Sequence, residues 1–174
     1  QKTSITGSGY HDHNWGNTPL QYLFDNWVWF RGEVEDKTVV AAVLYMTDKR
    51  GGYDVPILYV ADSSQVLINR FGGAGLYTKK SSLIKNLYNK KNEPLFSALD
   101  MITENGYKIN IQGKSVLDNS ALFKRMGMPF PFRLAMGASK IDPFYTRFDS
   151  ELTLKIKDKN PIEGFGVFEI MDLK

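Results

Sequence analysis

The sequence contains no cysteine, so it can form neither a disulfide framework nor a cysteine-ligated zinc site. It also lacks an apolar run that approaches the ~20 residues of a membrane-spanning helix, so no such helix is expected. Charge of one sign is scarce too, because 22 basic residues face 19 acidic ones and the formal net charge is only +3. That excess is too small to favour nucleic acid as the partner.

Aromatic residues, in contrast, are abundant. The 174 residues include 11 Phe, 9 Tyr and 3 Trp, too many for a disordered or low-complexity chain. The length fits one domain, and 43% hydrophobic residues can fill its core. We find no internal repeat and no linker, so residues 1–174 are expected to form a single domain. The aromatic surplus is typical both of a β-rich core and of an apolar ligand pocket.

The hydrophobic periodicity is that of β-structure. Ile109 and Ile111 alternate with polar neighbours, as do Leu152 and Leu154, which is the pattern of half-buried strands. Further strands are expected at residues 27–34, 38–47, 55–61, 66–70 and 164–172, the first two as a hairpin. Only residues 19–25 and 81–88 favour short helices. The predicted fold class is therefore all-β, an antiparallel barrel or sandwich of about eight strands.

Two stretches fit this pattern poorly. Residues 79–93 carry five lysines around apolar side chains. We interpret them as a solvated loop or surface helix, with a basic element touching an anionic membrane as the alternative. A second stretch is rich in Met and Phe and is expected to fill the core, or alternatively to line the mouth of an apolar pocket. Its residues are Met126, Met128, Phe130, Phe132 and Met136.

Both histidines of the chain fall within residues 7–16, which favours a site there. If this segment is extended, Tyr10, Asp12 and Asn14 point to one side. A carboxyl group between a phenol and an amide in an apolar barrel would have a raised pKa and can donate a proton. The alternative is that Asp12 and Asn14 only satisfy backbone groups of a turn.

The opposite side of the same segment carries His11, His13 and Trp15. Two imidazoles spaced by two residues can chelate a transition metal, which would indicate a metal-dependent hydrolase. A third ligand would have to come from a distant Asp or Glu, and no spacing in the sequence nominates one. Metal binding therefore ranks below acid catalysis, and no cofactor is expected.

A second constellation lies in the first predicted hairpin. Trp27, Trp29 and Arg31 alternate to one face of the strand, while Val28 and Phe30 take the other. Two indoles and a guanidinium on one face can form an aromatic wall with a stacked cation. The alternative is a Trp-lined core with Arg31 at its rim.

The motif Gly9-Tyr10-His11-Asp12-His13-Asn14-Trp15-Gly16, followed by Pro19-Leu20 and Trp27-Val28-Trp29-Phe30-Arg31, resembles the hydroxyneurosporene synthase family. That family comprises carotenoid 1,2-hydratases with lipocalin-like relatives, among them predicted secreted hydrolases and fungal Diels–Alderase-type cyclases. Weaker resemblance lies in residues 144–148 and 164–169.

The resemblance implies a lipocalin-like, calycin-type barrel with one or two short helices. It also implies that this chain is the C-terminal barrel of a two-barrel protein, whose N-terminal barrel is then its partner. The implied reaction is the acid-catalysed hydration or isomerisation of an apolar, isoprenoid-like alkene without a cofactor. Asp12 would be the acid, and Tyr10 and Asn14 would position it or the water.

In the same reading, ring faces would stabilise a developing cation, and the residues expected to contact the ligand are His11, His13, Trp15, Trp27, Trp29 and Arg31. The alternative function is a lipid-binding or lipid-transfer module without catalysis. Peripheral membrane contact would accompany it, and an exported or cell-envelope location is favoured over the cytoplasm.

Overall fold

The computed structural model describes residues 15–89, 92–138 and 143–173, together with residues 3, 4, 6, 11 and 13. The side chains at 85, 86, 125 and 136–138 are outside this description. Most of the described chain is β-structure. The strands are β1 (Phe24–Val34), β2 (Lys37–Met46), β3 (Asp54–Ala61), β4 (Val66–Phe71), β5 (Leu76–Tyr88), β6 (Pro94–Thr103), β7 (Lys108–Ala121), β8 (Phe144–Lys155) and β9 (Ile162–Asp172).

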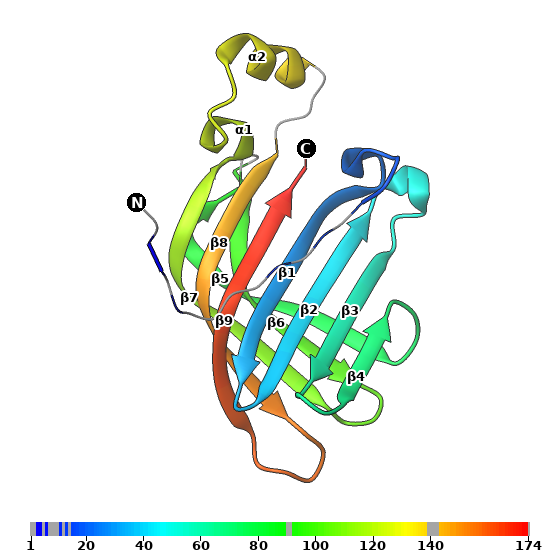
Figure 1. Ribbon diagram of the computed structural model, residues 1–174. Helices are drawn as coiled ribbons and strands as arrows, with labels where there is room; N and C mark the ends of the chain where they lie inside the picture. Colours follow the sequence, from blue (N-terminus) through cyan, green and yellow to red (C-terminus); the bar gives the residue numbers. More distant parts are fainter. Residues whose placement is uncertain are drawn as a thin grey trace.

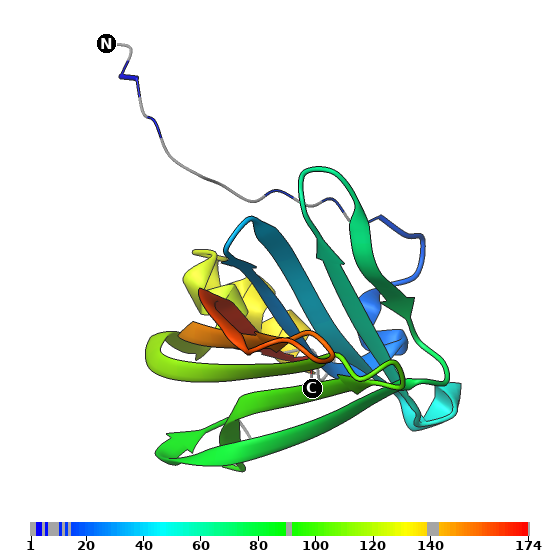
Figure 2. The same ribbon diagram turned by 90° about the horizontal axis from the view of Figure 1, so that it is seen from below.

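The nine strands form a single antiparallel sheet in the order β4-β3-β2-β1-β9-β8-β7-β6-β5. The chain therefore builds the sheet as a meander whose first and last strands, β1 and β9, pair in the middle. The sheet curls so that β1–β3 lie over β5–β7 (Figures 1 and 2). Its two edges, β4 and β5, follow each other in the chain, and an ion pair between Arg70 and Glu104 (3.4 Å) spans this seam. The predicted all-β, lipocalin-like class is confirmed.

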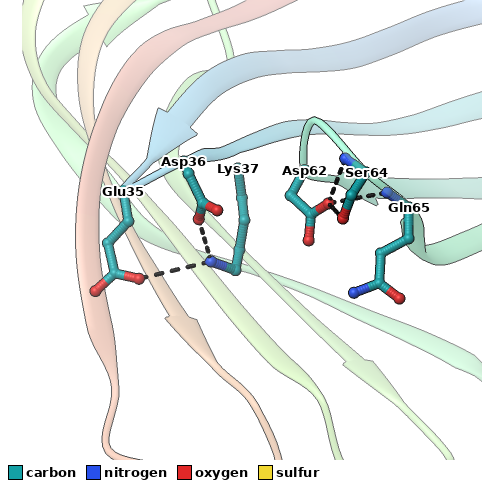
Figure 3. Close-up of polar contacts among 6 residues, drawn as sticks. All are labelled: Glu35, Asp36, Lys37, Asp62, Ser64 and Gln65. Atoms are coloured by element: carbon teal, nitrogen blue, oxygen red, sulfur yellow. Dashed lines mark hydrogen bonds and ion pairs between the residues drawn. The ribbon is translucent and has the colours of Figure 1, made fainter.

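The predicted hairpin of β1 and β2 is present, with a tighter connection than expected. Glu35 and Asp36 form the turn, and Glu35 adopts a φ of 53°. Lys37 already belongs to β2, and its ammonium contacts the carboxylates of Asp36 (2.5 Å) and Glu35 (3.6 Å) (Figure 3). The two carboxylates are exposed, whereas the Lys37 side chain is largely covered.

The turn between β3 and β4 is closed by the carboxylate of Asp62 (Figure 3). Its Oδ1 accepts hydrogen bonds from the Ser64 hydroxyl (2.7 Å) and from the backbone N–H groups of Ser64 (2.8 Å) and Gln65 (2.9 Å). These bonds, the Ser64 hydroxyl foremost, favour the ionised form and lower the pKa of Asp62 to about 2. The end signal at residues 62–64 thus marks a real strand boundary.

The core lies on the inner side of the curled sheet. Alternate residues of each strand point inward, as the predicted period of two requires. Phe168 is its aromatic centre, with its ring 6.0 Å from that of Phe148 and 6.1 Å from that of Phe96. The fully buried large side chains are Val28, Phe30, Val34, Leu58, Leu99, Met101, Ile109, Ile111, Phe148, Leu152, Leu154 and Phe168.

Strands β1 and β9 approach each other unusually closely. Gly32 pairs with Gly166, and the ring of Phe30 lies against both. A Cβ atom on Gly166 would lie 2.3 Å from the carbonyl oxygen of Arg31 and 2.6 Å from Cζ of Phe30. Glycine is therefore required here because the Phe30 ring and the neighbouring backbone fill the space of a side chain.

The helix predicted at residues 81–88 is wrong, because this stretch is the second half of β5. The apolar residues spaced by three and four gave a helical signal, but pairing with β6 overrides it. Lysine-rich residues 79–88 are thus an edge strand instead of a loop or helix. The other predicted helix, at residues 19–25, shrinks to a 3₁₀ turn, η1 (Leu20–Tyr22), before β1 begins.

Two short helices lie between β7 and β8, at one end of the barrel: α1 (Leu122–Arg125) and α2 (Phe130–Ala138) (Figure 1). We call this the helical end. Phe130, Phe132 and Met126 are each about two-thirds exposed, at 66%, 65% and 66%. The expectation that this stretch fills the core is wrong, because β7 and β8 pair directly up to Ala121 and Phe144 and the segment between them leaves the sheet. Within the described residues, no helix has the length and apolarity needed to cross a membrane.

Candidate functional site

The acid predicted from the motif lies outside the described residues, as do its two neighbours on the same face, Tyr10 and Asn14. Of the other face, His11, His13 and Trp15 are described, and all three are exposed. Trp15 is 86% exposed, and its ring lies 5.6 Å from that of His13 at a tilt of 59°. Across the part of the chain that the structure describes, no three His, Asp or Glu side chains gather as metal ligands.

The second constellation occupies one face of β1, as predicted. Val28 and Phe30 are fully buried on the inner side, whereas Trp27, Trp29 and Arg31 lie half-buried on the outer side. The alternative of a Trp-lined core is therefore wrong. The indoles instead form part of the outer surface of the barrel, beside strands β2 and β9.

A carboxylate that the sequence reasoning missed completes this surface. Nη1 of Arg31 donates to Oε1 of Glu169 on β9 over 2.9 Å, with side-chain exposures of only 26% and 16%. Glu169 pairs in register with Trp29 on one side and with Arg147 of β8 on the other. We call Trp27, Trp29, Arg31, Glu169 and Arg147 the tryptophan face. It combines two indole rings with a carboxylate that is paired to Arg31 and lies in register beside Arg147.

Arg147 also carries an unused hydrogen-bond donor on this face. Its Nε atom is buried and has no hydrogen-bond partner among the described residues. The next residue in register is Asp118 of β7, so acidic and basic side chains alternate across three neighbouring strands. No sequence signal joins these residues, because Arg31 and Glu169 are separated by almost the whole chain and meet only through the pairing of β1 with β9.

A second unpredicted cluster lies inside the barrel. The ammonium of Lys80 on β5 lies 3.6 Å from the ring centre of Tyr45 on β2 and 4.9 Å from that of Phe96 on β6. Strands β2 and β5 are far apart in the sheet, so this contact spans the interior. Much of Lys80 still touches solvent, yet burial lowers its pKa against the opposing charge of Asp54. Burial likewise raises the pKa of Tyr45.

Buried polar side chains hydrogen-bond at the helical end of the barrel. Nδ2 of Asn89 donates to Oδ2 of the buried Asp172 over 3.3 Å. The hydroxyl of Thr146 donates to Oδ1 of Asn119 over 2.8 Å. These two hydrogen bonds place polar groups beside buried side chains at the helical end of the barrel.

Comparison with solved structures identifies the fold. Similar structures include CghA (TM-score 0.60, 10% identity, 90% of this chain), CghA with Sch210972 (0.59, 11%, 89%) and kievitone hydratase from Nectria haematococca (0.57, 12%, 91%). At these identities they share the fold with this chain, an antiparallel lipocalin-like barrel found in a hydratase. The chain spans 42% of the length of each.

Sequence comparisons return nothing further. No protein-family profile matches the chain, and no curated protein matches it in a sequence search. The likeness is therefore one of fold, carried by the strand order and curl of the sheet.

Proposed function

We propose that the chain is one barrel of a hydratase-like protein, related to hydroxyneurosporene synthase, with a second barrel preceding it. Its reaction would be the cofactor-free hydration or isomerisation of an apolar, isoprenoid-like alkene. Support comes from the fold shared with kievitone hydratase over 91% of this chain. The observation that carries the proposal in this chain is the tryptophan face, where two half-buried indoles lie beside a carboxylate.

The proposed chemistry needs one proton donor and one water. Asp12 transfers its proton to the less substituted alkene carbon, and the π electrons of the double bond form the new C–H bond. The cation left on the other carbon is captured by a water oxygen. That water then returns a proton to the Asp12 carboxylate, which restores the catalyst. Tyr10 and Asn14 would orient the acid or the water.

Indole rings are suited to such an intermediate because their faces are electron-rich and attract cations. Trp27 and Trp29 would supply those faces, with Trp15, His11 and His13 close by in sequence. The nearby Arg31 would repel a cation if it were unpaired. Glu169 neutralises its guanidinium through the 2.9 Å contact, so the tryptophan face is not strongly positive.

The test uses the intact protein and kievitone, the compound named for the neighbouring hydratase. Product is detected by mass spectrometry as a gain of one water. We expect Asp12→Asn to abolish product formation while kievitone still quenches tryptophan fluorescence. Asp158→Asn is the matched control, because Asp158 is an exposed turn residue whose left-handed φ of 59° asparagine also tolerates.

A variant of the tryptophan face tests the cation step separately. Trp29→Leu should lower kcat by about 3- to 30-fold, the range of a lost cation–π contact, with a smaller effect on KM. Turnover by Asp12→Asn equal to that of the unaltered protein would refute Asp12 as the acid. Failure of the unaltered protein to hydrate kievitone or any prenylated compound in a panel would refute the hydratase proposal.

A lipid-binding module is the second candidate, and α2 favours it. Phe130, Phe132 and Leu134 are exposed on a helix at one end of the barrel. Residues 122–138 contain three basic residues and no acidic one, which suits an anionic lipid surface. Phe130→Ser with Phe132→Ser should then abolish sedimentation with anionic vesicles. The control Phe165→Ser removes an equally exposed ring elsewhere. Equal sedimentation of both variants would exclude docking through α2.

A further inference from the structure

A groove of about 460 Å³ lies on the outer side of the sheet, across β5 to β8 and apart from the tryptophan face. Its floor and walls are largely apolar, with Tyr77 from β5, Ile102 from β6 and Pro161 from the turn before β9. Tyr77 and Ile102 expose 65% and 40% of their surface, so both are available to a ligand in the groove. A volume of this size falls within the usual ~300–1,000 Å³ of small-molecule sites.

Three lysines line the same groove: Lys79 of β5, Lys108 of β7 and Lys155 of β8. All three are exposed, and no ion pair to a described carboxylate holds any of them. The one acidic residue in the lining is Asp100, whose carboxylate already accepts a hydrogen bond from Asn110 (2.7 Å). We call these three lysines with Tyr77, Ile102 and Pro161 the lysine groove.

The register of β7 and β8 places two like charges side by side, which does not favour the folded state when no ligand is bound. Lys108 and Lys155 are direct partners across the ladder, so two positive charges share one cross-strand position. Like charges in that position destabilise a sheet, whereas opposite charges stabilise it. Glu163, the nearest acidic residue of β9, faces Thr153 and not Lys155. An anion bound between the two lysines would remove the repulsion.

We infer that the lysine groove is a binding site for an anionic amphiphile, a compound with an apolar body and a single acidic group. The apolar body lies along Tyr77, Ile102 and Pro161. The acidic group lies between Lys108 and Lys155, where it receives charge-assisted hydrogen bonds from both ammonium groups. The site is separate from the tryptophan face, because the two share no residue.

The probe for this site is decanoate, compared with decanol, which has the same chain without the charge. Binding to the intact protein is measured by isothermal titration calorimetry. We expect decanoate to bind more tightly than decanol and to lose affinity as salt is raised. Lys108→Gln with Lys155→Gln should weaken decanoate binding about tenfold and leave decanol binding unchanged.

Two further variants locate the apolar part and the charge. Ile102→Ser should weaken both ligands, because it removes apolar surface from the groove floor. Lys159→Gln removes one positive charge, as Lys155→Gln alone does, but lies in the turn outside the groove, so it should bind decanoate normally. Equal affinity for decanoate and decanol, or equal losses from Lys159→Gln and Lys155→Gln, would overturn the inference.

Discussion

The tryptophan face and the lysine groove are both charged regions on the outside of one sheet, yet their charges are arranged in opposite ways. On the tryptophan face, Glu169 lies in register next to Arg147 and within 2.9 Å of Arg31, so each positive charge has a carboxylate neighbour. In the lysine groove, Lys108 faces Lys155 and the only carboxylate in the lining is already hydrogen-bonded.

This difference separates a surface on which Arg31 has a carboxylate partner from one on which two lysines face each other. Half-buried charges must be paired if the fold is to tolerate them, and the 2.9 Å contact between Arg31 and Glu169 meets that requirement within the chain. Exposed lysines are solvated by water and need no partner. The repulsion between Lys108 and Lys155 therefore lowers the stability of the fold only slightly while no anion is bound. The first arrangement should therefore contribute to stability, and the second should contribute only to binding.

The largest expected effect tests the backbone beneath the tryptophan face. Gly166→Ala places a Cβ atom 2.3 Å from the Arg31 carbonyl oxygen, so β1 and β9 must separate. We expect the free energy of unfolding to fall by about 3 kcal/mol or more, measured by urea titration. Gly16→Ala is the control, because nothing lies within 4 Å of its Cβ position. Equal stability of the two variants would show that the close approach is not required.

The second-largest expected effect tests the pairing of Glu169 with Arg31. Glu169→Gln leaves Arg31 and Arg147 half-buried with one carboxylate fewer, so stability should fall by about 1–3 kcal/mol. Glu151→Gln is the matched control, because its ion pair with Lys114 (2.8 Å) has exposures of 65% and 49%. That exposed pair should contribute less than about 0.5 kcal/mol. Similar losses of stability in both variants would show that half-buried and exposed ion pairs contribute equally to the fold.

Much of the barrel was predictable because strand periodicity is a local property of the sequence. The alternation at Ile109, Ile111, Leu152 and Leu154 predicted which side chains are buried, and all four are fully buried or nearly so. Residues 81–88 were predicted wrongly because their helical spacing is local too, whereas the pairing with β6 that determines their structure is not. The α2 segment was assigned to the core from composition alone, which says nothing about where a connection leaves the sheet.

The candidate sites were predictable only where a single strand carries them. Alternation placed Trp27, Trp29 and Arg31 on one face of β1, and that prediction is confirmed. Glu169 and the Lys80–Tyr45 contact could not be found in this way, because each joins residues from strands far apart in the chain. The roles assigned to Asp12, Tyr10 and Asn14 stay predictions.

The smallest effect tests whether the lysine groove is strained in the absence of a ligand. Lys155→Gln removes the repulsion with Lys108, so Tm should rise by about 1–2 °C, while Lys159→Gln should leave it unchanged. With decanoate present, the unaltered protein should have a higher Tm than Lys155→Gln. A ligand that binds only the folded state stabilises the protein that binds it, and the variant binds decanoate weakly. Differential scanning calorimetry with and without decanoate measures both effects. A lower Tm for Lys155→Gln without ligand would mean that this lysine stabilises the fold, and the contrast between groove and face would then disappear.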